Sequence, residues 1–227
     1  IYFLDPEAPN RLNSINGKLR GYHLPDPGER TPQMSKEDAR KHFKLPQDRL
    51  IFLHAGSPEK RKGLSDLIDA FYRLSKKTAW RKRALLLRIG PNDRLSEKTK
   101  KKLDHLVQNG LAELSGDFVS EDDFIEYFAA SDCVVIPYRK FRFSSGILAN
   151  AIMSERPVIC SDYGLIARTV KKHHFGRCYK HGSSRALAQE LERFDGHQID
   201  SKAVTPEEFI HKITAVQVRR NNQTNSK

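Results

Sequence analysis

The chain has 227 residues, of which 38% are hydrophobic and 30% charged, a balance typical of a soluble globular protein. It contains no run of about 18 apolar residues, and its N-terminus lacks the basic and apolar regions of a signal peptide. The net charge of +12 favours polyanionic partners: nucleic acid, an acidic membrane surface or phosphate-bearing ligands. Its lysines are not interleaved with aromatic residues, which argues against a single-stranded nucleic-acid binder.

Residues 1–33 hold two short apolar segments and several prolines. This pattern predicts a strand and a linker that remain from a preceding N-terminal domain. The chain also begins without a methionine and inside a strand-like run, so we expect a fragment of a longer protein.

A regular alternation of helical and strand-like patterns runs from residue 34 to about residue 195. Capping residues followed by apolar side chains at intervals of three and four predict helices, and short continuous apolar runs predict strands. The expected helices span residues 36–43, 64–74, a basic segment after 93, 121–129, 146–152, 166–172, 184–194 and a last helix from about 206. The expected strands span residues 49–54, 84–89, 111–114, 132–138, 157–160 and 176–179.

Strands that are apolar throughout and separated by helices indicate a parallel sheet covered on both faces. We therefore expect residues 34–195 to form one doubly wound, Rossmann-like α/β domain, and residues 196–227 to form a C-terminal helix and a frayed tail. Ligands bind such sheets at the carboxyl ends of the strands, which selects the loops after residues 54, 89, 114, 138 and 160. The chain has no G-x-G-x-x-G motif, so a nicotinamide or flavin cofactor is not expected.

The cysteines Cys133, Cys160 and Cys178 fall in apolar runs at a spacing that fits no metal motif. Buried free thiols in a reducing compartment are the simplest explanation, so we expect a cytoplasmic protein. The pair His173-His174 lacks a ligand partner at a useful spacing. No metal site is therefore predicted.

The turn Ser144-Ser145-Gly146 is the most informative local pattern, because it opens an apolar helix that a short buried strand follows. A helix N-terminus presents unpaired backbone N–H groups and the positive end of the helix dipole, and serine and glycine let a ligand approach them closely. Such a place binds anions, phosphates above all. An ordinary N-capped helix explains the same residues and stays an open alternative.

The candidate loops together resemble the C-terminal, donor-binding domain of GT-B glycosyltransferases, especially glycosyltransferase family 4. No single match is specific, but the order and spacing of the matches over residues 46–195 are. In chain order they are Gly56, Lys62-Gly63, Ile89-Gly90, Gly116-Asp117-Phe118, Ala130-Ser131-Asp132, Val135-Ile136-Pro137, Ser144-Ser145-Gly146, Pro157-Val158-Ile159 and Gly164.

The resemblance implies roles for several of these residues. Lys62 would contact the donor diphosphate, and residues 144–146 would provide the helix N-terminus beside it. A fixed ammonium and a helix end can stabilise the charge that develops on the leaving nucleoside diphosphate without a metal. Gly90 would lie at the nucleotide pocket, and Gly56 and Ser57 are further candidates for donor binding. A surface lysine beside a turn and a glycine that only ends a strand are the alternatives for Lys62 and Gly90.

The chain also departs from the family pattern. The family often has Gly-Arg where this chain has Gly56-Ser57, so one cation of the phosphate clamp is missing, and Arg61 is a candidate replacement. The family's two glutamates fall at Arg142 and Asn150. Asn150 can still accept a hydrogen bond from the ribose through its amide oxygen. Arg142 cannot accept a hydrogen bond and reverses the charge. Two explanations are therefore open: the donor carries an acidic sugar, or the site is degenerate.

The resulting hypothesis is the donor half of a retaining glycosyltransferase of polysaccharide biosynthesis. The enzyme would transfer a sugar from a nucleotide diphosphate sugar to a glycan or lipid-linked acceptor. This fragment would need its own N-terminal domain and would be inactive alone. Contact with the inner face of an acidic membrane is an additional expectation; a cofactor and nucleic acid are not expected. No catalytic residue is assigned, and retention is implied by the resemblance. The alternative is a degenerate, non-catalytic module that binds a nucleotide, glycan or protein partner.

Overall fold

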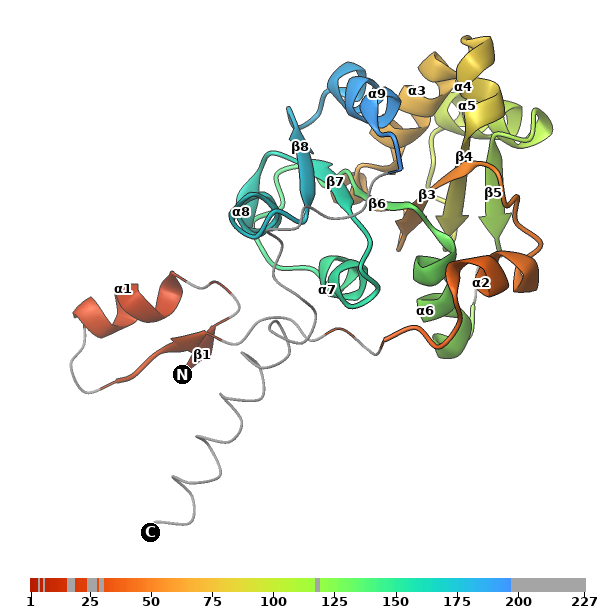
Figure 1. Ribbon diagram of the computed structural model, residues 1–227. Coiled ribbons are helices and arrows are strands. Elements are labelled where there is room, and N and C mark those ends of the chain that lie inside the picture. Colours follow the sequence, from red (N-terminus) through yellow and green to blue (C-terminus); the bar gives the residue numbers. More distant parts are fainter. Residues whose placement is uncertain are drawn as a thin grey trace.

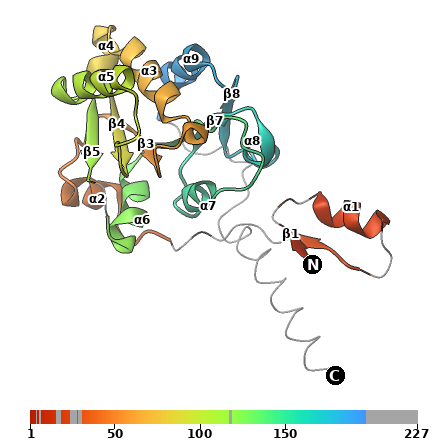
Figure 2. The ribbon, with the colours of Figure 1, turned by 180° about the vertical axis from the view of Figure 1, so that it is seen from behind.

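The computed structural model of the chain describes residues 1–3, 5, 7–15, 19–23, 28, 31–116 and 119–196. Its central feature is a six-stranded, all-parallel sheet in the order β5-β4-β3-β6-β7-β8, with helices on both faces (Figures 1 and 2). The strands are β3 (Leu50–Ala55), β4 (Ala84–Ile89), β5 (Ala112–Ser115), β6 (Cys133–Ile136), β7 (Val158–Ser161) and β8 (Gly176–Tyr179). The doubly wound fold predicted from the sequence is therefore confirmed.

Two apolar clusters, one on each face, form the core. Side chains alternate between them along each strand, so Phe52 enters one cluster while Ile51 and Leu53 enter the other. The helices packed on the Ile51 side are α2 (Lys36–His42), α6 (Glu121–Ala130), α7 (Gly146–Met153) and α8 (Gly164–Lys172). The helices on the Phe52 side are α3 (Leu64–Leu74), α4 (Thr78–Arg83), α5 (Glu97–Gln108) and α9 (Ser184–Arg193).

A buried ionic network fastens α2 and β6 to β3. The Asp132 carboxylate accepts a hydrogen bond from the Ile51 backbone N–H at 2.7 Å and pairs with the guanidinium of Arg40, which is 3% exposed. Lys36 reaches the other carboxylate oxygen at 3.2 Å. Arg40 also donates to the carbonyl of Ala130 at 2.9 Å. Because its charges and donors are mutually satisfied, the pair of Arg40 and Asp132 can remain buried next to the apolar core, while Lys36 stays partly exposed.

The N-terminal segment forms a small parallel unit beside the main body (Figure 1). It consists of β1 (Tyr2–Phe3), α1 (Ala8–Ile15) and β2 (Tyr22–His23). Arg168 on α8 forms an ion pair with Asp5 of this unit at 2.9 Å. The sequence predicted only a strand and a linker here, whereas the structure also contains α1, whose one buried residue is Pro9. A helix with so little buried surface lacks the apolar stripe that marks helices in a sequence.

One further helix and the ends of other elements differ from the prediction. Helix α4 was missed because it is short, cationic and anchored mainly by Trp80. Strand β6 ends at Ile136, since Pro137 has no N–H to continue the ladder. Helix α8 begins at Gly164, two residues before the predicted start. The helix predicted from about residue 206 and the matched pair Asp117-Phe118 lie outside the described residues.

No helix in the described part of the chain is long and apolar enough to cross a membrane. The three cysteines are free thiols, with Cys133 and Cys160 buried and Cys178 partly buried. Cys160 and Cys178 face each other on the neighbouring strands β7 and β8, with their sulfur atoms 3.5 Å apart.

Candidate functional site

The strand order places the candidate residues at one edge of the sheet. The order reverses between β3 and β6, which are neighbours although two strands separate them in sequence. Crevices at the carboxyl end of such a switch point are where open α/β sheets bind ligands. The loop after β3 carries residues 56–63 and the loop after β6 carries residues 137–145, so most of the predicted site residues meet there.

Lys62 is held against the end of β6 by the glycine that follows it. Gly63 has φ +69°, and a Cβ on it would lie 1.8 Å from the carbonyl oxygen of Pro137. Only glycine therefore lets the single 3₁₀ turn η1 (Lys60–Lys62) pack so closely on the loop after β6. The backbone N–H of Arg139 donates to the carbonyl of Arg61 at 2.8 Å and fixes the same contact.

A chain of polar contacts connects Lys62 to the N-terminus of α7. The Lys62 Nζ donates to the Tyr138 hydroxyl at 2.7 Å and lies 4.2 Å from the centroid of the Tyr138 ring. The Tyr138 hydroxyl lies 3.4 Å from the hydroxyl of Ser145, the N-cap residue of α7. The structure thus brings together the lysine and the helix end that the sequence analysis proposed as the phosphate site. Tyr138 itself was not predicted.

The first turn of α7 has the features of an anion site. Ser145 makes no side-chain cap bond, while its carbonyl accepts from the N–H groups of Leu148 and Ala149 at 2.9 and 3.2 Å. Within the described part of the chain, the N–H groups of Gly146 and Ile147 have no acceptor. Gly146 is exposed, and a Cβ on it would meet nothing within 4 Å. This helix end can accept an anion in front of Lys62.

The glycines after β3 and β4 form a second group of predicted residues. The N–H of Gly56 donates to the carbonyl of Ile89 at 3.1 Å, and a Cβ on Gly90 would lie 2.7 Å from the carbonyl oxygen of Gly56. Gly56 and Gly90 have φ +120° and +110°, a region that side chains disfavour. Gly90 therefore allows the close approach of the two loops, whereas at Gly56 only the positive φ favours glycine.

Arg61 is held by an acidic neighbour. Its Nε lies 2.7 Å from the Glu59 carboxylate, which also accepts from the Ser57 hydroxyl at 2.7 Å. These hydrogen bonds, first from Ser57 and then from Arg61, lower the pKa of Glu59. The Arg61 guanidinium also lies 5.2 Å from the ring centroid of Phe141. As the replacement for the missing phosphate-binding cation, Arg61 would have to leave Glu59.

Arg142 and Asn150, which replace the family's two glutamates, differ in their exposure to solvent. Arg142 is exposed, and its Nε donates to the hydroxyl of Tyr163 at 3.1 Å. Asn150 lies one turn inside α7 and is 2% exposed. Ser144 is partly buried just before the N-cap. Ligand contacts by Arg142, Ser144 and Asn150 remain predictions.

A buried polar pair beneath these loops was missed. Arg88 and His54 are register partners on β4 and β3, and both are 0% exposed. Burial lowers the pKa of Arg88 to about 10. The sequence signal was an arginine inside the apolar run from Leu85 to Ile89, where a charge is rarely buried without a partner.

We expect His54 to make the fold sensitive to acid. Burial, followed by the charge of Arg88, lowers the pKa of His54 to about 3, whereas an unfolded histidine titrates at about 6.5. The unfolded state therefore binds the extra proton, and stability is complete above about pH 6.5 and falls by at most about 1.4 kcal/mol per unit down to pH 3. Urea unfolding at pH 7 and pH 5 should show a smaller loss for His54→Leu than for the wild type. An equal loss in both would contradict this, and His105→Leu on the exposed face of α5 is the control.

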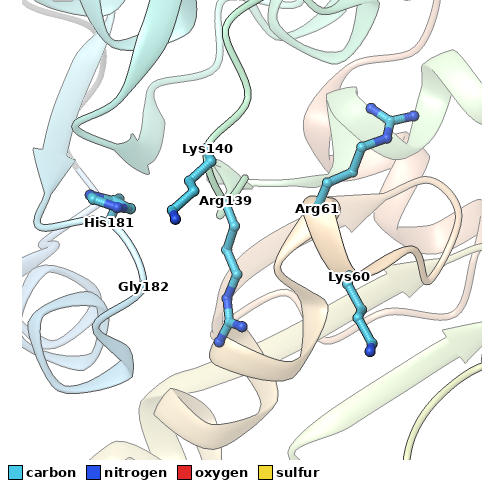
Figure 3. A pocket seen from close by; sticks show the side chains of 6 residues that line it. All are labelled: Lys60, Arg61, Arg139, Lys140, His181 and Gly182. Carbon is cyan, nitrogen blue, oxygen red and sulfur yellow. The ribbon is translucent and has the colours of Figure 1, made fainter.

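A basic hollow of about 390 Å³ lies beside this site. It is lined by Lys60, Arg61, Arg139, Lys140, His181 and Gly182. Figure 3 shows Lys140 and His181 on one side of it, while the side chains of Lys60 and Arg61 extend away from them. Arg139 is paired with Asp66 and His181 lies 3.7 Å from Asp162. Two of the cations around the hollow, Arg61 and Arg139, are therefore already paired with carboxylates.

In the described part of the chain, no group of three or more histidine, cysteine, aspartate or glutamate side chains could hold a metal ion. At the carboxyl edge of this doubly wound α/β domain, Lys62 and the N–H groups of Gly146 and Ile147 form an arrangement that can accept an anionic ligand. The model of the family "Glycosyl transferases group 1" matches residues 35–203, and the chain belongs to this family.

A similar curated protein is the one named as the teichuronic acid biosynthesis glycosyltransferase TuaC of Bacillus subtilis (strain 168). It is 26% identical over 168 residues, which cover 73% of this chain and 38% of TuaC. The chain thus spans well under half the length of that relative.

Solved structures share the fold at low identity. Sucrose-phosphate synthase from Thermosynechococcus elongatus gives a TM-score of 0.65 at 20% identity, covering 99% of this chain and 58% of the synthase. Anabaena HepE, solved in complex with UDP, gives a TM-score of 0.68 at 13% identity, covering 100% of this chain and 63% of HepE. The C-terminal domain of the group 1 glycosyl transferase LpcC from Francisella tularensis gives 0.60 at 20% identity, covering 84% of this chain and 95% of that domain.

Proposed function

We propose that the chain is the donor-binding, C-terminal half of a GT-B glycosyltransferase of family 4. It binds a nucleotide diphosphate sugar, whose sugar passes with retention to a glycan or lipid-linked acceptor in polysaccharide biosynthesis. The observation that carries the proposal is the contact chain from Lys62 through Tyr138 to Ser145 at the switch point of the sheet. The UDP in the HepE structure supports the ligand class, and the name of TuaC supports the pathway class.

The proposed chemistry depends on charge. Breaking the bond between the sugar and the diphosphate leaves a more negative nucleoside diphosphate, which the Lys62 ammonium and the N–H groups of Gly146 and Ile147 can stabilise. Donors that are fixed before the reaction stabilise such developing charge without reorganisation. Gly56 and Gly90 let the nucleotide approach the backbone, while Asn150 is proposed as the ribose acceptor. We name no catalytic base.

In this proposal residues 34–195 form the donor domain, and residues 1–33 continue from an N-terminal domain. The matched structures of sucrose-phosphate synthase and HepE are longer than the matched region, which supports a two-domain protein. The acceptor would bind across the cleft between the domains. A cytoplasmic enzyme in contact with an acidic membrane would suit both a lipid-linked acceptor and the net charge of +12.

A thermal-shift panel of nucleotides and nucleotide sugars tests the proposal. A ligand at about 100 times its dissociation constant stabilises the native state by roughly 2.7 kcal/mol, which is easily measured. We expect at least one nucleoside diphosphate to raise the melting temperature and its nucleoside to do so less. If none of the nucleotides with the common bases does so, the proposal fails.

Residues 1–227 alone should transfer no sugar, and clear turnover by this chain would show that the domain boundary is wrong.

Donor binding should not require a divalent cation, because Lys62 and the α7 N-terminus supply the positive charge. Calorimetry of the nucleoside diphosphate selected by the panel should give the same affinity with and without EDTA. A tenfold weaker affinity in EDTA that manganese restores would contradict this mechanism.

A further inference from the structure

Cys160 and Cys178 form a thiol pair that the candidate donor site does not use. They are register partners on the neighbouring parallel strands β7 and β8, so both side chains leave the same face of the sheet. Their sulfur atoms lie 3.5 Å apart, and the Cys178 sulfur also lies 3.9 Å from the carbonyl oxygen of Ala167 on α8. Two thiols at this separation are in position to react with each other.

The backbone at this pair already meets the geometric requirement of a disulfide. Neighbouring strands of a sheet lie about 4.8 Å apart. Disulfides join residues whose Cα atoms are about 4.4–6.8 Å apart. Because Cys160 and Cys178 lie directly opposite each other, a bond between them requires side-chain rotation rather than a shift of the strands.

The two thiols differ in their surroundings, which gives each a separate role. Cys178 lies partly exposed on the edge strand β8, whereas Cys160 is buried on β7. The hydrogen bond from the Cys160 thiol lowers the pKa of Cys178; the charge of Lys171 acts in the same direction, while burial and the carboxylates of Asp162 and Glu190 oppose it. The same hydrogen bond, together with burial, raises the pKa of Cys160. Cys178 is therefore the sulfur that ionises and meets a reagent from solvent first.

We propose that Cys160 and Cys178 are a redox-active dithiol, which hydrogen peroxide converts into a reversible disulfide across β7 and β8. The Cys178 thiolate attacks one peroxide oxygen, so an S–O bond forms, the O–O bond breaks, and the leaving hydroxide takes up a proton to become water. The Cys160 sulfur then attacks the Cys178 sulfur, the S–O bond breaks, and the Cys160 proton leaves with the second water. The dithiol gives up two electrons, which the peroxide accepts, and an external thiol reverses the reaction by exchange.

The third cysteine is separated from this reaction by the sheet. Cys133 belongs to the apolar cluster on the Phe52 side, whereas Cys160 belongs to the cluster on the Ile51 side. The Cys133 thiol is fully buried, and burial raises its pKa. It should therefore stay reduced while the pair is oxidised, and it serves as an internal reference.

The disulfide would fasten one edge of the sheet. In the described sheet β8 has a strand neighbour on one side only, and the loops after β7 and β8 begin just beyond the pair. In these loops the Asp162 carboxylate accepts from the N–H of His181 at 2.9 Å, and the Tyr163 hydroxyl accepts from Arg142 at 3.1 Å. A cross-link at the thiol pair would hold the starts of both loops together and oppose local opening of β8.

The wild type is tested first, as the whole chain, by treatment with hydrogen peroxide followed by unfolding and alkylation with iodoacetamide. Mass spectrometry should find the peptides of Cys160 and Cys178 joined and two hydrogen atoms lighter than the reduced pair, with Cys133 alkylated. Dithiothreitol should restore alkylation of all three thiols. The amides of β8 should exchange hydrogen more slowly in the oxidised protein, because the cross-link opposes opening of the edge strand.

Single serine variants separate the two roles. Cys160→Ser should still form a sulfenic acid at Cys178, which dimedone traps, but no disulfide within the chain. Cys178→Ser should react with peroxide about tenfold more slowly, because the remaining Cys160 thiol is buried and rarely ionised. Cys133→Ser should match the wild type and is the control.

The proposal fails if the wild type keeps all three thiols at a peroxide concentration that oxidises a free cysteine peptide. It also fails if the disulfide includes Cys133 or joins two molecules. Equal rates for Cys160→Ser and Cys178→Ser would overturn the role of Cys178 as the attacking thiol. Should a serine variant not fold, the mapping of the wild type decides by itself, and none of these results depends on nucleotide binding.

Discussion

Replacing Asp132 with alanine should lower the free energy of unfolding by about 3–5 kcal/mol, because it leaves a buried cation without its partner. The Arg40 guanidinium is 3% exposed and would keep its bonds to backbone carbonyls but lose the carboxylate. The Ile51 N–H would lose its acceptor as well. The three elements α2, β3 and β6 meet at this carboxylate, so the loss should be global rather than confined to one helix.

Urea unfolding followed by circular dichroism measures this change. Asp38→Ala is the matched control, because Asp38 is an exposed carboxylate paired with Lys41 at 3.7 Å and should cost less than about 1 kcal/mol. The double change Arg40→Met with Asp132→Leu removes both charges and should be far less destabilising than Asp132→Ala alone. A loss below about 1 kcal/mol for Asp132→Ala would show that the network contributes little.

The sheet and most helices could be predicted because their signals are local. Apolar runs such as residues 50–53 and 84–87 indicate strands that are covered on both faces. The cap residues Ser35 and Ser120 predicted the starts of their helices, and each accepts a hydrogen bond from the N–H three residues later. Ser96 caps α5 in the same way but was not used in the prediction. Helix α4 lacks a side-chain cap, and the one buried residue of α1 is Pro9, so neither helix shows a strong local signal.

The site was predictable only in part, for a different reason. Lys62 and the Ser144–Gly146 turn were found because each belongs to a local motif. The contact between them depends on Tyr138, which comes from a third place in the chain. The burial of Arg88 depends on two backbone carbonyls, of Gly56 and Pro91, that accept hydrogen bonds from its guanidinium. No pattern in one segment carries information of that kind.

Lys62→Ala should weaken binding of the nucleoside diphosphate by roughly ten- to a hundredfold, since a hydrogen bond to a charged group is worth about 1.5–3 kcal/mol. The lost contact is to phosphate, so the bare nucleoside should bind nearly as before. The Lys62 Nζ lies 2.7 Å from the Tyr138 hydroxyl and 4.2 Å from its ring centroid, which keeps the ammonium beside the N-terminus of α7. An ammonium held in place in this way loses little conformational entropy when a phosphate binds.

Calorimetry with both ligands distinguishes this contact from a general effect of charge. Lys60→Ala is the matched control, because Lys60 lies in the same 3₁₀ turn, is exposed and carries the same charge. Asn150→Ala should cost only about 0.5–1.5 kcal/mol and weaken nucleoside and diphosphate alike, because it removes a neutral hydrogen bond to the ribose. If Lys62→Ala binds the diphosphate as tightly as Lys60→Ala does, the phosphate does not sit between Lys62 and α7. The contact of Lys62 with Tyr138 would then serve only to hold the loop after β3 against the loop after β6.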